Sequence, residues 1–175
     1  MLINMAASEP ELGSPARGGM PATTATPVAD GWRITGHKTF VTASPALHSI
    51  LVSVALPPTP DAPKGTVATA IVDADAPGVR LVDNWSDGLG LRTSGSFDVV
   101  LEDVFVADRW LVDRQPVGVT PPPAPPYHMA WFGLMLATVY LGIGQAACDT
   151  ACAYARKRTP TALGRPIATV SGVQR

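Results

Sequence analysis

The sequence has only two cysteines, Cys148 and Cys152, and almost no excess charge of either sign. The two cysteines lie four residues apart on one face of a helix, with no other residue nearby at metal-ligand spacing, so we predict buried free thiols and no metal site. A formal net charge of -1 provides no basic patch for phosphates, so nucleic-acid binding is not expected. Met1–Met5 has neither a positive charge nor a long apolar run, so no signal peptide is predicted and a cytoplasmic location is expected.

Acidic residues are missing from one long stretch, because no Asp or Glu occurs between Asp113 and Asp149. Elsewhere, no Ser/His/Asp order or carboxylate pair stands out. Three scattered histidines are predicted to be structural: His37, His48 and His128. General acid–base chemistry needs a titratable group at the reacting atom. No residue is therefore assigned as catalytic.

Apolar residues are plentiful, and 46% hydrophobic with 15% charged residues is the balance of a globular protein. Short β-rich runs broken by turn residues follow one another from Thr23 to Val106, which is typical of an antiparallel barrel or sandwich. Turn residues at Asp30-Gly31 and Gly36 predict a hairpin followed by a third strand. The expected strands are 22–26, 32–35, 38–42, 49–56, 67–73, 79–82 and 97–106.

Proline dominates residues 116–126, which rules out a helix or strand ladder there and predicts a linker. The proline-free stretch His128–Arg158 then predicts a helix roughly 45 Å long, and its basic end suits a helix C-terminus. Met129–Ala147 is uncharged, close to what a membrane span needs. Gln145, Asp149 and three glycines favour instead a helix buried in a bundle, so no membrane span is predicted.

Two motifs have the chemistry to hold a planar ring. Ser8–Ser14 combines hydroxyls with glycine, which allows close backbone approach and hydrogen bonding to a polar edge. Lys38–Thr42 sets an aromatic face beside a hydroxyl. Taken singly, they are equally typical of an ordinary loop and an amphipathic strand. Gly88–Gly90 with Gly95 looks like a dinucleotide-binding loop, but a strand pattern follows it where that fingerprint requires a helix.

Taken together and in order, five motifs resemble the middle domain of the acyl-CoA dehydrogenase family. They are Ser8–Ser14, Gly36–Thr42, Val72–Val79, Gly90–Ser96 and Leu101–Val106. The resemblance continues at Tyr140–Ala147, Tyr154–Arg158 and Gly164–Pro166, and covers essentially the whole chain. It implies an α+β fold, with an antiparallel β-barrel followed by part of an all-α C-terminal bundle. The implied domains are a flavin- and acyl-CoA-contacting domain at 1–113, a Pro-rich linker at 114–127 and the start of the bundle at 128–175.

The resemblance also implies a non-covalently bound FAD, and removal of an α-proton coupled to hydride transfer from the β-carbon of an acyl-CoA thioester. Matched position by position, Ala7 and Ser8 would touch the pyrimidine side of the flavin. Phe40, Val41 and Thr42 would line the isoalloxazine ring, with Thr42 hydrogen-bonded to it.

Two further matches concern the substrate and the phosphates. Ser14 would face the thioester arm of acyl-CoA, and Arg158 would reach the FAD pyrophosphate of a neighbouring subunit, where a guanidinium suits phosphate. Such a protein is usually a homo-oligomer. Pro15 replaces a frequent aspartate, and Thr159–Leu163 is longer than the usual turn.

The family's catalytic glutamate has no counterpart in this sequence. We therefore expect a fragment of an oxidoreductase of fatty acid metabolism that does not turn over substrate alone. Two alternatives remain open at this stage. One is a flavin-dependent monooxygenase on the same fold, and the other is a non-catalytic remnant or interaction module.

Overall fold

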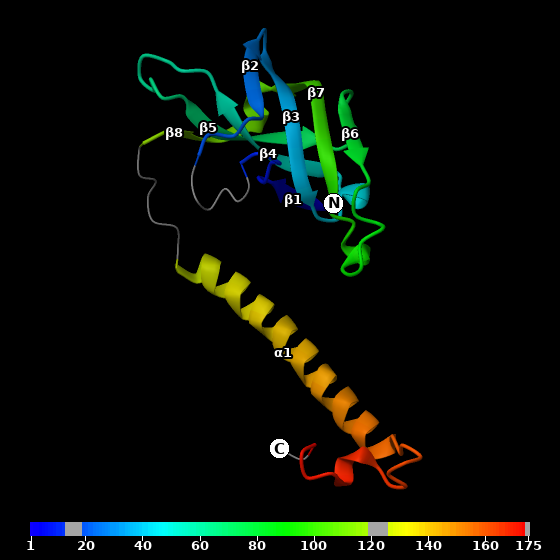
Figure 1. Ribbon diagram of the computed structural model, residues 1–175. Helices are drawn as coiled ribbons and strands as arrows, with labels where there is room; N and C mark the ends of the chain where they lie inside the picture. Colours follow the sequence, from blue (N-terminus) through cyan, green and yellow to red (C-terminus); the bar gives the residue numbers. More distant parts are fainter. Residues whose placement is uncertain (13–18, 119–125, 174–175) are drawn as a thin grey trace. The chain divides into compact units, whose positions relative to one another are not determined.

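The computed structural model describes residues 1–12, 19–118 and 126–173, which form two compact units, Met1–Pro121 and Pro122–Arg175. Among the described residues of the first unit, eight strands form one sheet (Figure 1). They are β1 Ile3–Ala6, β2 Thr24–Val28, β3 Gly31–Val41, β4 Ser49–Leu56, β5 Thr66–Asp73, β6 Val79–Val82, β7 Phe97–Ala107 and β8 Leu111–Pro116. The second unit contains one long helix, α1 (Pro126–Lys157), followed by the short 3-10 turn η5 (Ile167–Thr169).

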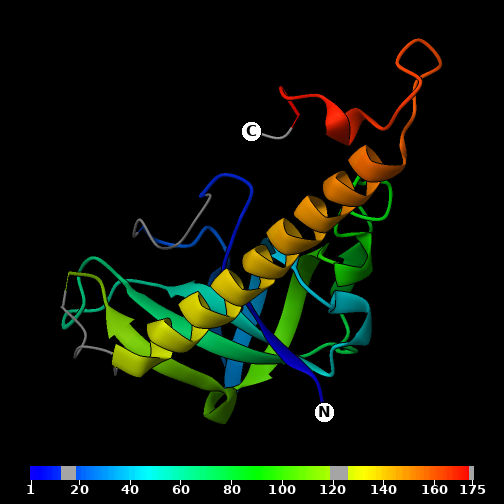
Figure 2. The same cartoon turned by 90° about the horizontal axis from the view of Figure 1, so that it is seen from below.

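The strands pair in the order β6-β7-β3-β2-β4-β5-β8, with β1 added to β4. Neighbours are antiparallel except at two places, because β1 runs parallel to β4 and β2 meets β4 in parallel at Thr24 and Ala55. The predicted β domain followed by a helix is therefore confirmed, with a mixed sheet in place of a purely antiparallel one. Figure 1 and Figure 2 show β3 and β7 running across β4 and β5, so that the sheet bends around a common core.

The core of the first unit is built largely from alternate residues of these strands, most clearly at Ile50, Val52 and Val54 of β4. Alternation is expected because successive side chains of a strand point to opposite faces. Fully buried members are Ile34, Val41, Ile50, Val52, Val54, Ala70, Val72, Val99 and Val104. Each large apolar side chain buried in this way contributes roughly 1.5–3 kcal/mol of transfer free energy. This core fixes the positions of β3 and β7, which carry the candidate site.

The predicted strands at 49–56, 67–73, 79–82 and 97–106 are confirmed to within one residue. The predicted break at Gly36 is wrong, because β3 continues through it. A Cβ atom at Gly36 would lie 2.4 Å from Thr23 Oγ1, so the glycine permits close approach of the chain at Thr23 instead of turning the strand. The start of the predicted linker is also wrong, since residues 114–116 belong to β8, and α1 starts two residues earlier than predicted.

Helix α1 has the predicted length and apolar composition. It packs against η5 within its own unit, and its described side chains are largely exposed there. Cys148 and Cys152 are exposed free thiols, so their predicted burial is wrong within this unit. By length and composition alone, Ala130–Lys157 is long and apolar enough to cross a membrane, with an 18-residue window of mean hydropathy 1.4, and core helices of water-soluble proteins meet the same criterion.

Candidate functional site

The described residues of the two predicted ring-holding motifs lie side by side in the first unit. The backbone N–H of Thr39 donates to the carbonyl oxygen of Ser8 at 3.0 Å. The side-chain amide of Asn4 donates to the carbonyl oxygen of Thr42 at 2.9 Å. These two bonds attach β1 and its continuation to the end of β3. Residues about thirty positions apart in the sequence therefore form one surface.

A β-bulge sets the direction of Phe40. The pairing of β3 with β7 shifts register between Lys38 and Val41, and Phe40 has a φ of 57°. A left-handed conformation costs a non-glycine residue about 1–2 kcal/mol, and strained residues of this kind cluster at ligand sites. The bulge leaves Phe40 65% exposed, while Val41 is fully buried in the core. Bulges commonly re-aim a side chain next to a functional site.

The ring of Phe40 is flanked by a second aromatic residue. Trp85 meets it edge to face, with ring centroids 6.1 Å apart and an interplanar angle of 81°. The indole N–H of Trp85 donates to the carbonyl oxygen of Leu91 at 2.8 Å, which holds the loop between β6 and β7. Two aromatic rings thus stand together at the end of β3 and offer an apolar surface to a planar ligand.

Three hydroxyl groups form a chain beside this aromatic pair. Thr42 Oγ1 lies 2.9 Å from Ser96 Oγ, and Ser96 Oγ lies 2.8 Å from Ser94 Oγ. Ser96 is only 5% exposed, whereas Thr42 is exposed. The backbone N–H of Ala43 donates to the carbonyl oxygen of Ser94 at 2.8 Å, which ties the turn to the end of β3. The outermost hydroxyl, that of Thr42, is therefore held from behind.

A buried ion pair lies beneath the surface. Lys38 Nζ is 2.7 Å from Glu9 Oε1, and the two side chains are 0% and 2% exposed. Glu9 also accepts hydrogen bonds from the N–H and hydroxyl of Thr23 and from the N–H of Ala22. Burial alone would raise the pKa of Glu9, but the hydrogen bonds from Lys38, Thr23 and Ala22 outweigh it and lower the pKa to about 2. Since Glu9 follows Ser8 and Lys38 precedes Thr39, the pair fixes one motif against the other.

Strands β3 and β7 are joined by a histidine–carboxylate contact. His37 Nε2 lies 2.8 Å from Asp98 Oδ2, and the His37 side chain is 43% exposed while that of Asp98 is 10% exposed. This contact ties β3 to β7 near the hydroxyl chain.

The predicted site residues differ in where they lie and in how exposed they are. Ala7 and Ser8 are half-buried, and Phe40 and Thr42 are exposed beside them. The side chain of Val41 lies in the core, so only its backbone is available to a ligand. Ser14 lies outside the described residues, and Arg158 belongs to the second unit.

The sequence patterns missed four residues of this surface: Asn4, Trp85, Ser94 and Ser96. The two serines lie within the motif Gly90–Ser96, which was recognised only as part of the resemblance. Asn4 and Trp85 lie in segments without a chemical signal of their own. Their roles depend on pairing between distant strands.

Arg158 lies beside a pocket of about 790 Å³ in the second unit. The pocket is lined by Thr150, Ala153, Tyr154, Lys157, Arg158 and Thr159. Two cations and the hydroxyls of Tyr154 and Thr159 can donate to phosphate oxygens at this place, whereas the Thr150 hydroxyl donates to Ala146 O of its own helix at 2.7 Å. The phosphate-binding role of Arg158 stays a prediction.

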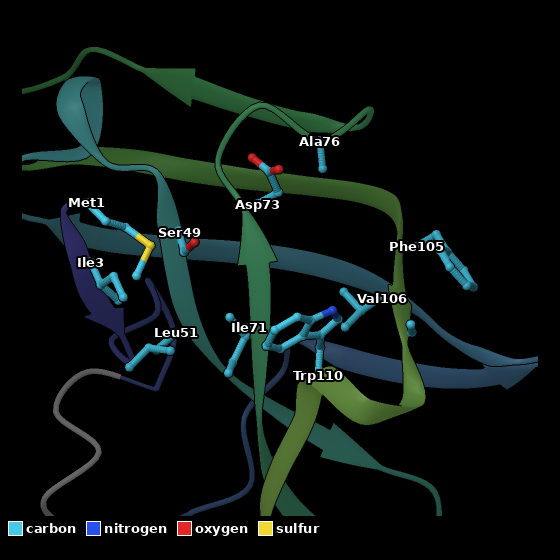
Figure 3. A pocket seen from close by; sticks show the side chains of 11 residues that line it. Met1, Ile3, Ser49, Leu51, Ile71, Asp73, Ala76, Phe105, Val106 and Trp110 are labelled. Atoms are coloured by element: carbon cyan, nitrogen blue, oxygen red, sulfur yellow. The ribbon is translucent and has the colours of Figure 1, made fainter.

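A separate apolar pocket of about 510 Å³ lies in the first unit (Figure 3). Its walls include Ile3, Leu51, Ile71, Phe105 and Trp110, with Ser49 and Asp73 as polar members. None of the predicted ring-contacting residues lines it. The candidate site is therefore the open surface of Ser8, Phe40 and Thr42, where an aromatic face, a fixed hydroxyl and main-chain groups fit a planar ring with a polar edge.

Comparison with known proteins identifies related sequences. The family model described as acyl-CoA dehydrogenase, middle domain, matches residues 4–104. The Bacillus subtilis (strain 168) protein named "Putative acyl-CoA dehydrogenase YdbM" is 35% identical over 175 residues, which are 99% of this chain and 42% of that protein. The amino sugar nitrososynthase RubN8 of Streptomyces rubradiris is 36% identical over 75% of this chain and 30% of its own length.

Solved structures with a similar fold include proteins of the same kinds as the sequence relatives. KijD3, solved in complex with FMN and a dTDP-linked sugar, is 27% identical with a TM-score of 0.67 over 98% of this chain and 40% of that chain. An acyl-CoA dehydrogenase of Geobacillus kaustophilus shares the fold, with a TM-score of 0.72 at 20% identity over 99% of this chain and 44% of that chain. The chain thus spans less than half the length of these relatives.

Proposed function

The chain belongs to the acyl-CoA dehydrogenase family, and from this premise we propose that it forms the ring-contacting face of a flavin site in a flavin-dependent oxidoreductase. The observation that carries the proposal is the hydrogen bond from Thr39 N–H to Ser8 O, which brings the two ring-holding motifs onto one surface. The FMN complex of KijD3 supports a flavin as the ligand of this fold.

Each residue of the surface has a defined part in the proposal. Main-chain groups of Ala7 and Ser8 meet the pyrimidine side of the ring, Phe40 packs against the ring, and the Thr42 hydroxyl forms a hydrogen bond to its edge. Arg158 binds the pyrophosphate of FAD held by another subunit of a homo-oligomer, since a guanidinium pairs with two phosphate oxygens. A bound flavin supplies the capacity to accept a hydride.

For the reaction of the whole protein, we propose α,β-dehydrogenation of an acyl-CoA thioester, in keeping with the acyl-CoA dehydrogenases among the sequence relatives. This chain alone has no counterpart of the family's catalytic glutamate and is not expected to complete the reaction. A second candidate is a flavin-dependent monooxygenation of an amine, favoured by the 36% identity to an amino sugar nitrososynthase. The two differ in what the flavin reacts with. An acyl-CoA substrate reduces oxidised flavin without oxygen, whereas a monooxygenase needs reduced flavin and oxygen and leaves acyl-CoA unchanged.

Flavin binding is the first experiment. The 175-residue chain is mixed with FAD and passed through gel filtration, and the flavin spectrum is recorded across the protein peak. We expect flavin to co-elute with the wild type and to be lost from Phe40→Ala. Phe105→Ala is the matched control, since it removes an exposed aromatic side chain from the separate pocket. Absence of bound flavin in the wild type, or equal loss in both variants, would contradict the proposed surface.

A further inference from the structure

The hydroxyl chain Thr42–Ser96–Ser94 joins an exposed residue to the buried hydroxyl of Ser96 and continues to Ser94 in the turn before β7. Both hydrogen bonds are short, at 2.9 Å and 2.8 Å, and the middle hydroxyl is buried. Ser94, at the other end of the chain, is half-buried. An exposed threonine normally has a freely rotating hydroxyl, so this arrangement restricts Thr42 in a way that its exposure does not explain.

Counting protons shows what the chain imposes on Thr42. A hydroxyl has one proton to donate and two lone pairs to accept with. Ser96 lies between two hydroxyls, and either atom can be the donor in each bond, so a continuous chain in which Ser96 donates to one neighbour and accepts from the other has two possible directions. If Ser96 donates to Thr42, the proton of Thr42 is free to point outward. If Ser96 donates to Ser94, Thr42 donates inward and presents lone pairs outward.

We propose that Ser96 and Ser94 are positioning residues that hold the Thr42 hydroxyl against a flavin and let it serve as either donor or acceptor. This inference rests on the proposed flavin site. An oxidised isoalloxazine ring carries a nitrogen on its edge that accepts a hydrogen bond, and the same nitrogen carries a proton after reduction. Thr42 can donate to the oxidised nitrogen in one direction of the hydrogen-bond chain and accept from the protonated nitrogen in the other. The switch requires that all three hydroxyls reverse their donor and acceptor roles together. Polarisation along such a chain strengthens each bond in it.

A double-mutant cycle on flavin binding tests the positioning role. The variants of the full chain are Ser96→Ala, Thr42→Val and the double variant, with Ser96→Thr as the conservative replacement. Ser44→Ala is the matched control, because Ser44 is also buried and its hydroxyl donates to Gly95 O at 3.1 Å in the same turn without touching Thr42. The dissociation constant of FAD is measured by the quenching of the protein's tryptophan fluorescence. It is measured for the oxidised cofactor in air and for the dithionite-reduced cofactor without oxygen.

We expect Ser96→Ala to weaken both redox forms roughly five- to tenfold, the effect of about one hydrogen bond. In the Thr42→Val background the same change should have less than about a twofold effect, since the group that Ser96 positions is gone. Ser96→Thr keeps a hydroxyl and should bind FAD within about twofold of the wild type, as should Ser44→Ala.

The outcomes separate this inference from the proposed function. Failure of the wild type to bind FAD overturns the flavin site itself. Binding by the wild type with equal affinity in Ser96→Ala overturns the positioning role alone, and so does an additive loss in the double variant. Weakening of only one redox form overturns the two-way direction of the chain.

Discussion

The ion pair of Glu9 and Lys38 gives the sharpest stability prediction. Glu9→Gln removes the carboxylate and leaves the ammonium of a 0% exposed lysine without its charged partner. Burial lowers the pKa of Lys38, and the hydrogen bond and charge of Glu9 oppose that shift. Without Glu9 the burial effect is unopposed, so the pKa of Lys38 falls further.

The size of the loss follows from two limits. Breaking a buried ion pair by removing one partner typically costs about 3–5 kcal/mol. The lysine can also escape its penalty by losing its proton, and from an ordinary pKa of 10.5 this costs at most about 5 kcal/mol at pH 7, at about 1.4 kcal/mol per pH unit. We therefore expect Glu9→Gln to lower the free energy of unfolding at pH 7 by about 3–5 kcal/mol.

The sign of the pH dependence identifies the cause. In Glu9→Gln the unfolded chain binds a proton at Lys38 more tightly than the folded chain, so stability rises with pH between the lowered folded pKa and the unfolded value. Urea unfolding followed by tryptophan fluorescence at several pH values from about 6 to 10 measures this rise. Lys38→Met in the same chain should abolish the rise and recover part of the lost stability, because no charge is left unpaired. A loss that is independent of pH, or that Lys38→Met deepens, would refute the reasoning.

Three further predictions concern the same region. The pKa of Glu9 is lowered to about 2, so above pH 5 its carboxylate should contribute up to about 3 kcal/mol to the free energy of unfolding of the wild type. This contribution should be lost as the pH falls from 5 to 2. Acid titration followed by circular dichroism should show the loss in the wild type and not in Glu9→Gln. At Phe40, with its φ of 57°, valine should be less stable than asparagine by about 1 kcal/mol in urea unfolding, and equal stability would show that the bulge can straighten. Gly36→Ala should lower the free energy of unfolding by about 1–3 kcal/mol, because its Cβ would lie 2.6 Å from Thr23 Cα. Gly90→Ala is the control, since no atom lies within 4 Å of its Cβ, and an equal loss of stability in this variant would contradict the reasoning.

The central strands could be predicted because their signal is local. β4, β5, β6 and β7 are rich in valine and isoleucine and are bounded by turn residues, so their limits follow from composition alone. β1 is only four residues long and pairs with β4, more than forty positions away. β8 contains charged residues and a proline and pairs with the distant β5. Neither β1 nor β8 has a local sequence pattern that predicts a strand, because each is stabilised by its pairing with a distant strand.

The candidate site shows the same division. Ser8, Phe40 and Thr42 were recognised through the family resemblance, and their side-chain chemistry was visible in the sequence. The outward direction of Phe40 was not, because it results from a bulge in the pairing of β3 with β7. The bulge also explains why Val41 turns into the core. The partners of Thr42 depend on the register of the same two strands.

The buried ion pair and the bulge together explain how this surface is specified. A shift of one residue in the register of a strand turns every side chain to the opposite face. Near the end of β3 such a shift would turn Phe40 into the core, where a large aromatic side chain would not fit in place of Val41. Glu9 bonds to Lys38, Thr23 and Ala22 at once, so a slipped register would leave buried charges without partners. We therefore expect Glu9→Gln to weaken flavin binding as well as stability. Adding Lys38→Met should recover stability without restoring flavin affinity, and full affinity in the double variant would show that the bulge alone maintains the register.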